Sequence, residues 1–210
     1  MSEVSDPIFA RIARRYDLIN RVLSLGQEKK WRSRGVAMLP HGRVLDLGSG
    51  TGDTDFGGRQ VVDLDPVIEM ISLSPVGPRV VATGESMPFS DGSFEGVFSA
   101  FVFRNLTSVT LTLEEVDRVL TPGGVAVIVD LARPRNSLLR VLHRIGTAIV
   151  LPVAGLLLAG APKEYWYLHK SLDSLPDPEE LFEGHELALE EVWRSGLFGF
   201  VYGARLRKPR

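Results

Sequence analysis

Five short apolar runs, separated by glycine, proline and one helical stretch, dominate the first two thirds of this chain. They lie at residues 43–47, 60–64, 79–82, 96–101 and 124–131. Such nearly continuous runs are typical of strands that a parallel sheet buries on both faces. Residues 113–120 have the three- and four-residue spacing of a helix and stop before a Pro-Gly-Gly turn at 122–124. This order predicts an α/β fold with a doubly wound, mostly parallel Rossmann-like sheet, and ligands at the carboxyl ends of its strands.

Composition narrows the class of protein. The 24 Lys and Arg residues nearly balance 26 Asp and Glu residues, and apolar residues make up 44% of the 210. This is the composition of a globular protein, and it gives no support to nucleic-acid binding. The absence of cysteine excludes disulfides, thiolate nucleophiles and cysteine zinc sites, and no histidine cluster indicates another metal site. Because the first residues lack the apolar core of a secretory signal, we expect a cytoplasmic protein.

A glycine-rich turn follows the first predicted strand, in the sequence Asp46-Leu47-Gly48-Ser49-Gly50-Thr51-Gly52. Glycines allow a sharp turn and a close approach of a ligand to the backbone amides. The spacing GxGxG differs from the dinucleotide pattern GxGxxG. The next predicted strand ends in Asp65, which could accept hydrogen bonds from two ribose hydroxyls. The residues alone leave two interpretations open, a nucleotide-like cofactor site and a purely structural turn.

The chain is expected to be one domain, 1–210, in three parts. Phe9, Ile12, Tyr16, Ile19 and Leu23 recur at helical spacing, so residues 1–42 are predicted to form an amino-terminal helical cap. Residues 43–135 would be the cofactor-binding half. Residues 136–210 would hold a lid and a carboxyl-terminal antiparallel edge hairpin, formed by strands at 187–192 and 200–206.

Residues 145–161 carry no charge. Their length is near the lower limit for a membrane span, but Pro152 and three glycines favour a core or lid helix. A surface that contacts lipid is the second alternative, and a span is the third.

Several motifs resemble one family. VLDLGSGTGD, followed by a strand ending in Asp65, resembles the class I S-adenosylmethionine-dependent methyltransferases. Four further segments resemble the UbiE/Coq5/MenG group, which C-methylates ubiquinone and menaquinone precursors. They are YDLINRVLSLGQEKKW (16–31), SMPFSDGSFEGVFSAFVFRNLTS (86–108), RVLTPGGVAVIVDLARP (118–134) and EYWYLHKSLDSLPDPEEL (164–181). Because they cover nearly the whole chain in the family's order, we interpret it as a quinone-type methyltransferase.

The resemblance implies S-adenosylmethionine as cofactor and a prenylated hydroquinone, a demethylmenaquinol or ubiquinol precursor, as substrate. It also implies a peripheral contact with the inner membrane face and a homodimer. Arg104 would stabilise a phenolate on the acceptor and orient its ring together with Asn105, and Tyr16 would close the site. The expected cofactor-binding residues are Asp46, Gly48, Gly50, Thr51, Asp65, Thr83, Gly84 and Ala100.

Some positions depart from the family pattern. The turn at 82–84 lacks the family's acid or Asn, Glu28 stands where the signature often has His, and Asp130 replaces a Glu. Only thirteen residues separate Gly52 from Asp65, where such folds need about 20. The first crossover therefore has room for barely one helical turn, and the second for a short helix at 67–73. Two alternatives stay open: a methyltransferase for another lipid or phenolic acceptor, and a cofactor-binding relative that has lost turnover.

Overall fold

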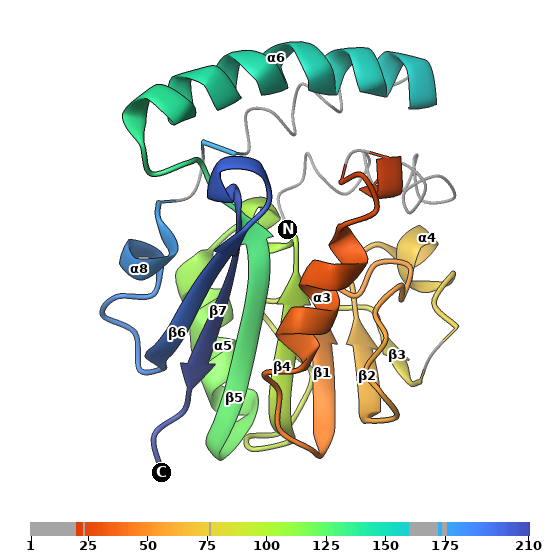
Figure 1. Ribbon diagram of the computed structural model, residues 1–210. Coiled ribbons are helices and arrows are strands. Elements are labelled where there is room, and N and C mark those ends of the chain that lie inside the picture. Colours follow the sequence, from red (N-terminus) through yellow and green to blue (C-terminus); the bar gives the residue numbers. More distant parts are fainter. Residues whose placement is uncertain (1–19, 23, 76, 160–171, 174–175) are drawn as a thin grey trace.

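A computed structural model describes residues 20–22, 24–75, 77–159, 172–173 and 176–210. They form one seven-stranded sheet in the order β3-β2-β1-β4-β5-β7-β6 (Figure 1). The first five strands pair in parallel, and the last two add an antiparallel edge. The strands are β1 (Arg43–Leu47), β2 (Gln60–Leu64), β3 (Arg79–Val80), β4 (Phe94–Ala100), β5 (Leu120–Leu131), β6 (Ala188–Ser195) and β7 (Val201–Arg207). The predicted fold class is confirmed.

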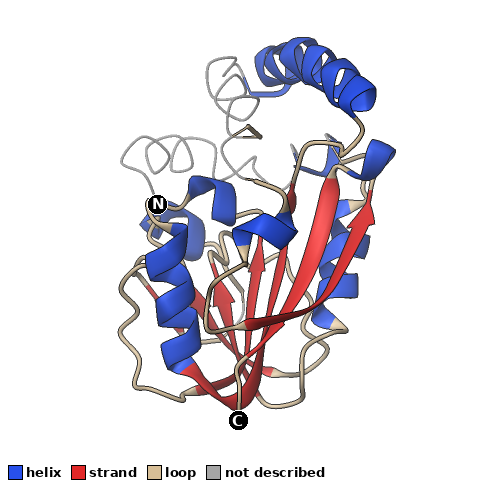
Figure 2. Cartoon of the chain, turned by 90° about the vertical axis from the view of Figure 1, so that its left-hand side faces the viewer, coloured by secondary structure: helices blue, strands red, loops and turns tan. Residues whose placement is uncertain are grey.

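Helices lie on both faces of the sheet and over one edge of it (Figure 2). Two short 3-10 segments, η2 (Phe103–Asn105) and η3 (Leu197–Gly199), follow β4 and β6. The α-helices are α3 (Glu28–Val36), α4 (Ile68–Ile71), α5 (Val109–Val119), α6 (Ser137–Ala159) and α8 (Pro178–Leu181). All five residues of the predicted amino-terminal stripe, Tyr16 among them, lie outside the described residues.

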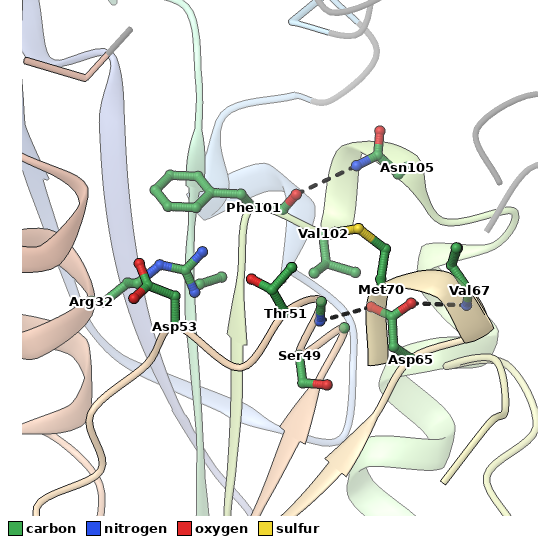
Figure 3. Close-up of a pocket in the computed structure, with 13 residues that line it drawn as sticks. Arg32, Ser49, Thr51, Asp53, Asp65, Val67, Met70, Phe101, Val102 and Asn105 are labelled. Atoms are coloured by element: carbon green, nitrogen blue, oxygen red, sulfur yellow. Dashed lines mark hydrogen bonds between the residues drawn. The ribbon is translucent and has the colours of Figure 1, made fainter. Parts of the chain in front are cut away.

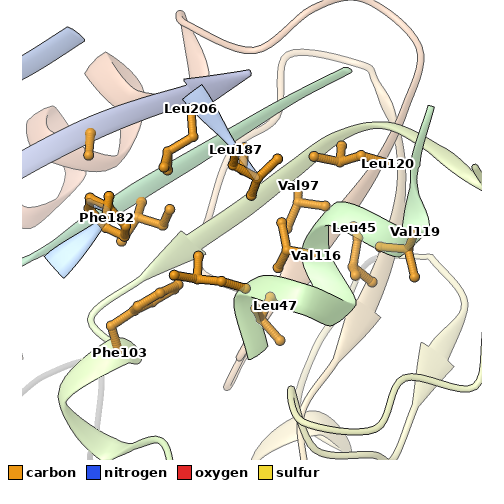
Figure 4. Close-up of a cluster of buried hydrophobic side chains, with 14 of the residues drawn as sticks. Leu45, Leu47, Val97, Phe103, Val116, Val119, Leu120, Phe182, Leu187 and Leu206 are labelled. Carbon is orange, nitrogen blue, oxygen red and sulfur yellow. The ribbon is translucent and has the colours of Figure 1, made fainter. Parts of the chain in front are cut away.

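Strand periodicity divides the core into two layers. Val44 and Leu45 of β1 point to opposite faces, as consecutive strand residues must. One face packs on α3, where a Cβ at Gly35 would lie 2.8 Å from Val129 Cγ2, so the helix approaches the sheet closely. The other face packs on α5 and α8 and forms the larger cluster (Figure 4). The site is thereby built at the end of a rigid double-sided core.

Element boundaries were predicted well for β1 and β2 and less well elsewhere. β3 has two residues instead of four. Strand β5 begins at Leu120 instead of 124. Residues 121–124 stand opposite the single residue Glu95 of β4, and Gly123 has a φ of 78°, so the chain bends within the strand at the predicted turn. Helix α5 begins at 109 rather than 113. Ser108 caps its amino-terminal end, because the Ser108 Oγ accepts a hydrogen bond from the Leu111 N–H. β4, β6 and β7 differ from their predicted bounds by one to three residues.

The predicted shortening of the crossovers is confirmed. No helix lies between β1 and β2, where the loop instead packs Phe56 edge-on against Phe98, with ring centroids 5.5 Å apart. Between β2 and β3, the described residues 65–75 and 77–78 form one helix, the four-residue α4.

Residues 145–159 of the uncharged segment belong to α6, a helix of 23 residues that contains Pro152 and lies across the carboxyl ends of the strands (Figure 1). Its position is that of a lid. Among the described residues no helix is both long and apolar enough to cross a membrane. One side of α6 carries large apolar side chains that are more than half exposed: Leu138, Val141, Leu142, Ile145, Ile149 and Val153.

Candidate active site

The glycine turn forms the floor of a cleft at the carboxyl edge of the sheet. Gly48, Gly50 and Gly52 all have positive φ angles, of 72°, 59° and 73°. A Cβ at Gly48 would lie 2.3 Å from Val102 Cγ2, so no larger residue fits there. The Gly48 N–H donates to the Leu64 carbonyl at 2.7 Å, which ties the turn to the end of β2.

Asp65 fixes this turn from the neighbouring strand. One of its oxygens accepts the Gly50 N–H and the other the Val67 N–H, each at 2.9 Å (Figure 3). The carboxylate is 5% exposed and lines the cleft. Because a carboxylate can accept about four hydrogen bonds, Asp65 can hold the loop and accept from ligand hydroxyls as well.

The cleft brings together most of the predicted cofactor residues. Gly48, Gly50, Thr51, Asp65 and Ala100 line it, and Asn105 joins them. Asp46, Thr83 and Gly84 do not line it.

Asp46 lies buried near the turn. Burial raises its pKa to about 8, and Asp63 and Asp65 add to this while Arg32 opposes it. At neutral pH its carboxyl group is therefore protonated, and in the described structure its Oδ2 has no hydrogen-bond partner. Asp46 is therefore a neutral group beneath the site and offers a ligand no ionic contact.

The turn at 82–84 packs against the α5 face. Thr83 forms an isolated β-bridge with Ser86, and a Cβ at Gly84 would lie 3.1 Å from Thr112 Cγ2. The expected contact of Thr83 and Gly84 with the cofactor stays a prediction.

Arg32 supplies a cation to the cleft from α3, and the sequence analysis missed it. Its Nη1 donates to Thr54 Oγ1 at 2.9 Å, and its guanidinium lies 5.3 Å from the ring centre of Phe101. Within the described residues its buried Nε has no acceptor. An arginine with an unused donor at a cleft suits a ligand carboxylate. The sequence offered one signal for Arg32: it directly follows Trp31, the last residue of the 16–31 segment that resembles the family.

A second pocket of about 380 Å³ lies between the sheet edge and α6. Its walls are mostly apolar, with Trp31, Phe101 and Phe200 on one side and Val150 and Leu151 of α6 on the other. This size and character suit an aromatic ring with an apolar substituent. The charged or titratable side chains that line it are Glu28, Arg104 and His143.

Arg104 belongs to η2 and lines this pocket, and the carboxylate of Asp130 holds its guanidinium. Its Nη1 donates to Asp130 Oδ1 at 2.6 Å, and the Leu131 N–H donates to the same oxygen at 2.7 Å. The side chains of Arg104 and Asp130 are 7% and 0% exposed. The neighbouring Asn105 lines the other cavity, so the two residues predicted as a catalytic pair lie in adjacent pockets.

Phe101 separates the two cavities and lines both. Its φ of 67° is in the left-handed region, which is strained for an aromatic residue. The Phe101 N–H donates to the Val129 carbonyl at 2.7 Å, and its own carbonyl accepts from Asn105 Nδ2 at 3.4 Å. The surrounding structure therefore maintains a strained backbone where a polar cleft and an apolar pocket meet.

Comparison with known proteins agrees with this geometry. The sequence matches the ubiE/COQ5 methyltransferase family over residues 2–76 and 78–190. The chain belongs to this family. A demethylmenaquinone methyltransferase of Deinococcus radiodurans is 38% identical over 83% of this chain and 79% of its own. A ubiquinone/menaquinone biosynthesis C-methyltransferase, UbiE, of Geotalea uraniireducens is 36% identical over 82% of each chain.

Solved structures resemble the fold at lower identity. A SAM-dependent methyltransferase of Thermotoga maritima has a TM-score of 0.61 at 17% identity and covers 97% of this chain and 99% of its own. Another from Aquifex aeolicus has a TM-score of 0.57 at 18% identity, covering 90% and 92%. The chain is therefore a methyltransferase by family and has the fold of this enzyme class.

Proposed function

We propose that this enzyme transfers the methyl group of S-adenosylmethionine to a ring carbon of a prenylated hydroquinone of the demethylmenaquinol type. The observation that carries the proposal is the pair of cavities that share Phe101 as a wall, one polar and glycine-lined, the other apolar and covered by α6. The names of the family relatives support the choice of a quinol over other aromatic acceptors.

The residues of the polar cleft fit the cofactor. Asp65 would accept the ribose hydroxyls, the glycine turn admits the nucleoside close to the backbone, and the guanidinium of Arg32, which lines the cleft, would bind the methionyl carboxylate. When bound, the cofactor's sulfonium supplies an electrophilic methyl group.

The second pocket would orient the acceptor ring and stabilise its charge. Methyl transfer to a ring carbon is faster from the phenolate than from the phenol, because deprotonation raises the electron density of the ring. Arg104, held as a cation by Asp130, would stabilise the anionic ring oxygen. Trp31 and Phe200, whose ring centroids lie 5.9 Å apart, give the pocket an aromatic wall for the acceptor ring.

Helix α6 would receive the apolar tail of the acceptor. Its inner side lines the pocket, and its exposed apolar side, with Arg144 at 65% side-chain exposure beside it, suits contact with an anionic lipid surface. A quinol could then reach the pocket from the bilayer surface without crossing bulk water.

The test is methyl transfer from labelled S-adenosylmethionine to demethylmenaquinol, with mass spectrometry to locate the new methyl group. Arg104→Ala should lower kcat and leave cofactor affinity nearly unchanged, because the charge that Arg104 stabilises develops in the transition state. Methylation of tailless phenols in preference to the quinol would indicate a different acceptor. Failure to bind S-adenosylmethionine at millimolar concentration would contradict the proposal altogether.

A further inference from the structure

One carboxylate in the acceptor pocket has no part in the chemistry described so far. Glu28 is the first residue of α3, lines the pocket and is only 5% exposed. Its Oε2 accepts a hydrogen bond from Ser24 Oγ. Glu28 forms no ion pair with any residue that the structure describes.

We propose that Glu28 is the general base that removes the hydroxyl proton of the acceptor. The assignment rests on the proposed function, since it requires a phenolic acceptor in this pocket. A buried carboxylate with no cationic partner among the described residues is costly to maintain there, because burial removes water that would solvate its charge. A hydroxyl group of the substrate would supply a second donor beside Ser24 Oγ.

The other polar side chains of the pocket are less suited to accept a proton. Arg104 has donors only and remains charged. His143 Nδ1 lies 3.3 Å from Nη1 of Arg133, and an arginine nitrogen can only donate, so Nδ1 is the acceptor in that contact. A neutral histidine in this arrangement carries its proton on Nε2. It can therefore accept a proton only by giving up the hydrogen bond from Arg133.

The proposed step balances as follows. The acceptor O–H bond breaks, its proton moves to the Glu28 carboxylate, and its electron pair stays on the ring oxygen. The ring carbon then forms a bond to the methyl carbon as the C–S bond breaks, and the sulfur keeps that electron pair. Loss of the ring proton at the methylated carbon restores aromaticity. One proton is released for each methyl group transferred, and no oxidant or reductant is needed.

Glu28 and Arg104 would thus act on the same oxygen, that of the acceptor hydroxyl. Glu28 would remove the proton, and Arg104 would stabilise the charge that remains. The two groups come from different elements, α3 and η2, and both line the pocket.

Three variants test the assignment in the full chain. Glu28→Gln keeps the shape and removes the base, Glu28→His installs a different base at a position where the family signature often has one, and Glu183→Gln is a matched control on the exposed surface. For each variant, kcat with demethylmenaquinol is measured between pH 5.5 and 9. Cofactor affinity by calorimetry and the melting temperature are measured in parallel.

We expect Glu28→Gln to lower kcat by about 10²- to 10⁴-fold, the usual range for loss of a general base. Its cofactor affinity should stay within about twofold. Glu28→His should recover much of the rate, with the acid limb of its kcat profile near the ordinary histidine pKa of about 6.5. Arg104 and His143 line the same pocket as Glu28, and the cations of its own helix are Lys29, Lys30, Arg32 and Arg34. Because all of them are unchanged in these variants, a moved acid limb would report residue 28.

Two results would overturn the assignment. One is a Glu28→Gln enzyme with kcat within about threefold of the parent and the parent's pH profile. The other is a Glu28→Gln enzyme whose loss of rate is matched by loss of cofactor affinity or a large drop in melting temperature, which would make the residue structural. A parent enzyme that binds cofactor but does not methylate the quinol overturns the proposed function, and that result is obtained before any variant is made.

Discussion

Asp130 holds Arg104 in the acceptor pocket through a buried contact of 2.6 Å between Oδ1 and Nη1. The pair is inaccessible to solvent on the Asp130 side, and Asp130 lies opposite Tyr202 in the β5–β7 register. Burial, together with the charge of Asp130, raises the pKa of Tyr202 well above its usual value, so that hydroxyl stays neutral. The charge of Arg104 is thus balanced from within the sheet.

Breaking this pair should strongly destabilise the fold. Asp130→Ala leaves a buried guanidinium without its counterion and should lower the free energy of unfolding by about 3–5 kcal/mol. The double variant Arg104→Met with Asp130→Leu should lose less, because it buries no unpaired charge. Urea unfolding of the parent and both variants measures this. If Asp130→Ala lowers the free energy of unfolding by less than about 1 kcal/mol, the pair is not buried as described.

Removing the Asp65 carboxylate should weaken cofactor binding. The loss of a buried, charged hydrogen-bond acceptor costs about 1.5–3 kcal/mol, so Asp65→Ala should raise the Kd for S-adenosylmethionine by roughly one to two decades. Calorimetric titration measures the change. Glu69→Ala, on an exposed position of the nearby α4, is the control and should leave the affinity unchanged. Equal affinities for parent and Asp65→Ala would contradict the ribose assignment.

Asp46 should make stability depend on pH. Its pKa rises from 3.8 in the unfolded chain to about 8 on folding, because it is buried. Between these values the folded protein holds a proton that the unfolded chain has released, so this residue lowers stability as pH rises. Relative to Asp46→Asn, the parent should lose up to about 1.4 kcal/mol per pH unit between pH 5 and 8. A constant difference between the two in urea unfolding at pH 5, 6.5 and 8 would contradict the raised pKa.

Two helical glycines should respond in opposite ways to alanine. A Cβ at Gly35 meets Val129 and Phe98 at 2.8 and 2.9 Å, so Gly35→Ala should destabilise the protein by about 1–3 kcal/mol, less the small gain in helix propensity. A Cβ at Gly146 would have no described atom within 4 Å, so the same change should stabilise by up to about 1 kcal/mol. Melting temperatures of both variants give the signs. A stabilising Gly35→Ala would mean that α3 packs less closely than described.

The exposed side of α6 should bind lipid. Ile145 and Ile149 are 56% and 61% exposed and do not line the acceptor pocket. The double change to Asp should abolish cosedimentation with anionic vesicles and lower activity on long-tailed acceptors more than on tailless ones. Leu111→Asp, on the exposed surface of α5, is the control. If the parent itself does not bind vesicles, the lipid contact is wrong.

The fold could be predicted from the sequence where local and global signals agree. Residues 43–47 and 60–64 are apolar runs bounded by turn residues, and both strands begin and end where expected. The start of β5 was missed because Pro122 and Gly123 signal a turn, whereas Leu120 already pairs with Phe94 before the bend at Gly123. Tertiary pairing of this kind leaves no local pattern.

The site was predictable only in part. The glycine turn and Asp65 follow two neighbouring parallel strands, so their meeting at one cleft could be predicted from the sequence although their spacing is shorter than usual. Arg32 reaches the site through the docking of α3. Phe101 lies in a quoted motif, but the left-handed backbone that places its ring between the two cavities leaves no pattern in the sequence. Glu28 stood out in the sequence as an exception to the family pattern, and its burial in the acceptor pocket became visible only in three dimensions.

The shared wall at Phe101 limits how this enzyme can be redesigned. A smaller side chain there would enlarge the acceptor pocket and also remove the ring over which Arg32 lies. Glycine would relieve the left-handed backbone but erase the partition between the two cavities. Acceptor range and cofactor affinity are therefore not independently adjustable at this residue, and a library aimed at new acceptors should vary α6 instead.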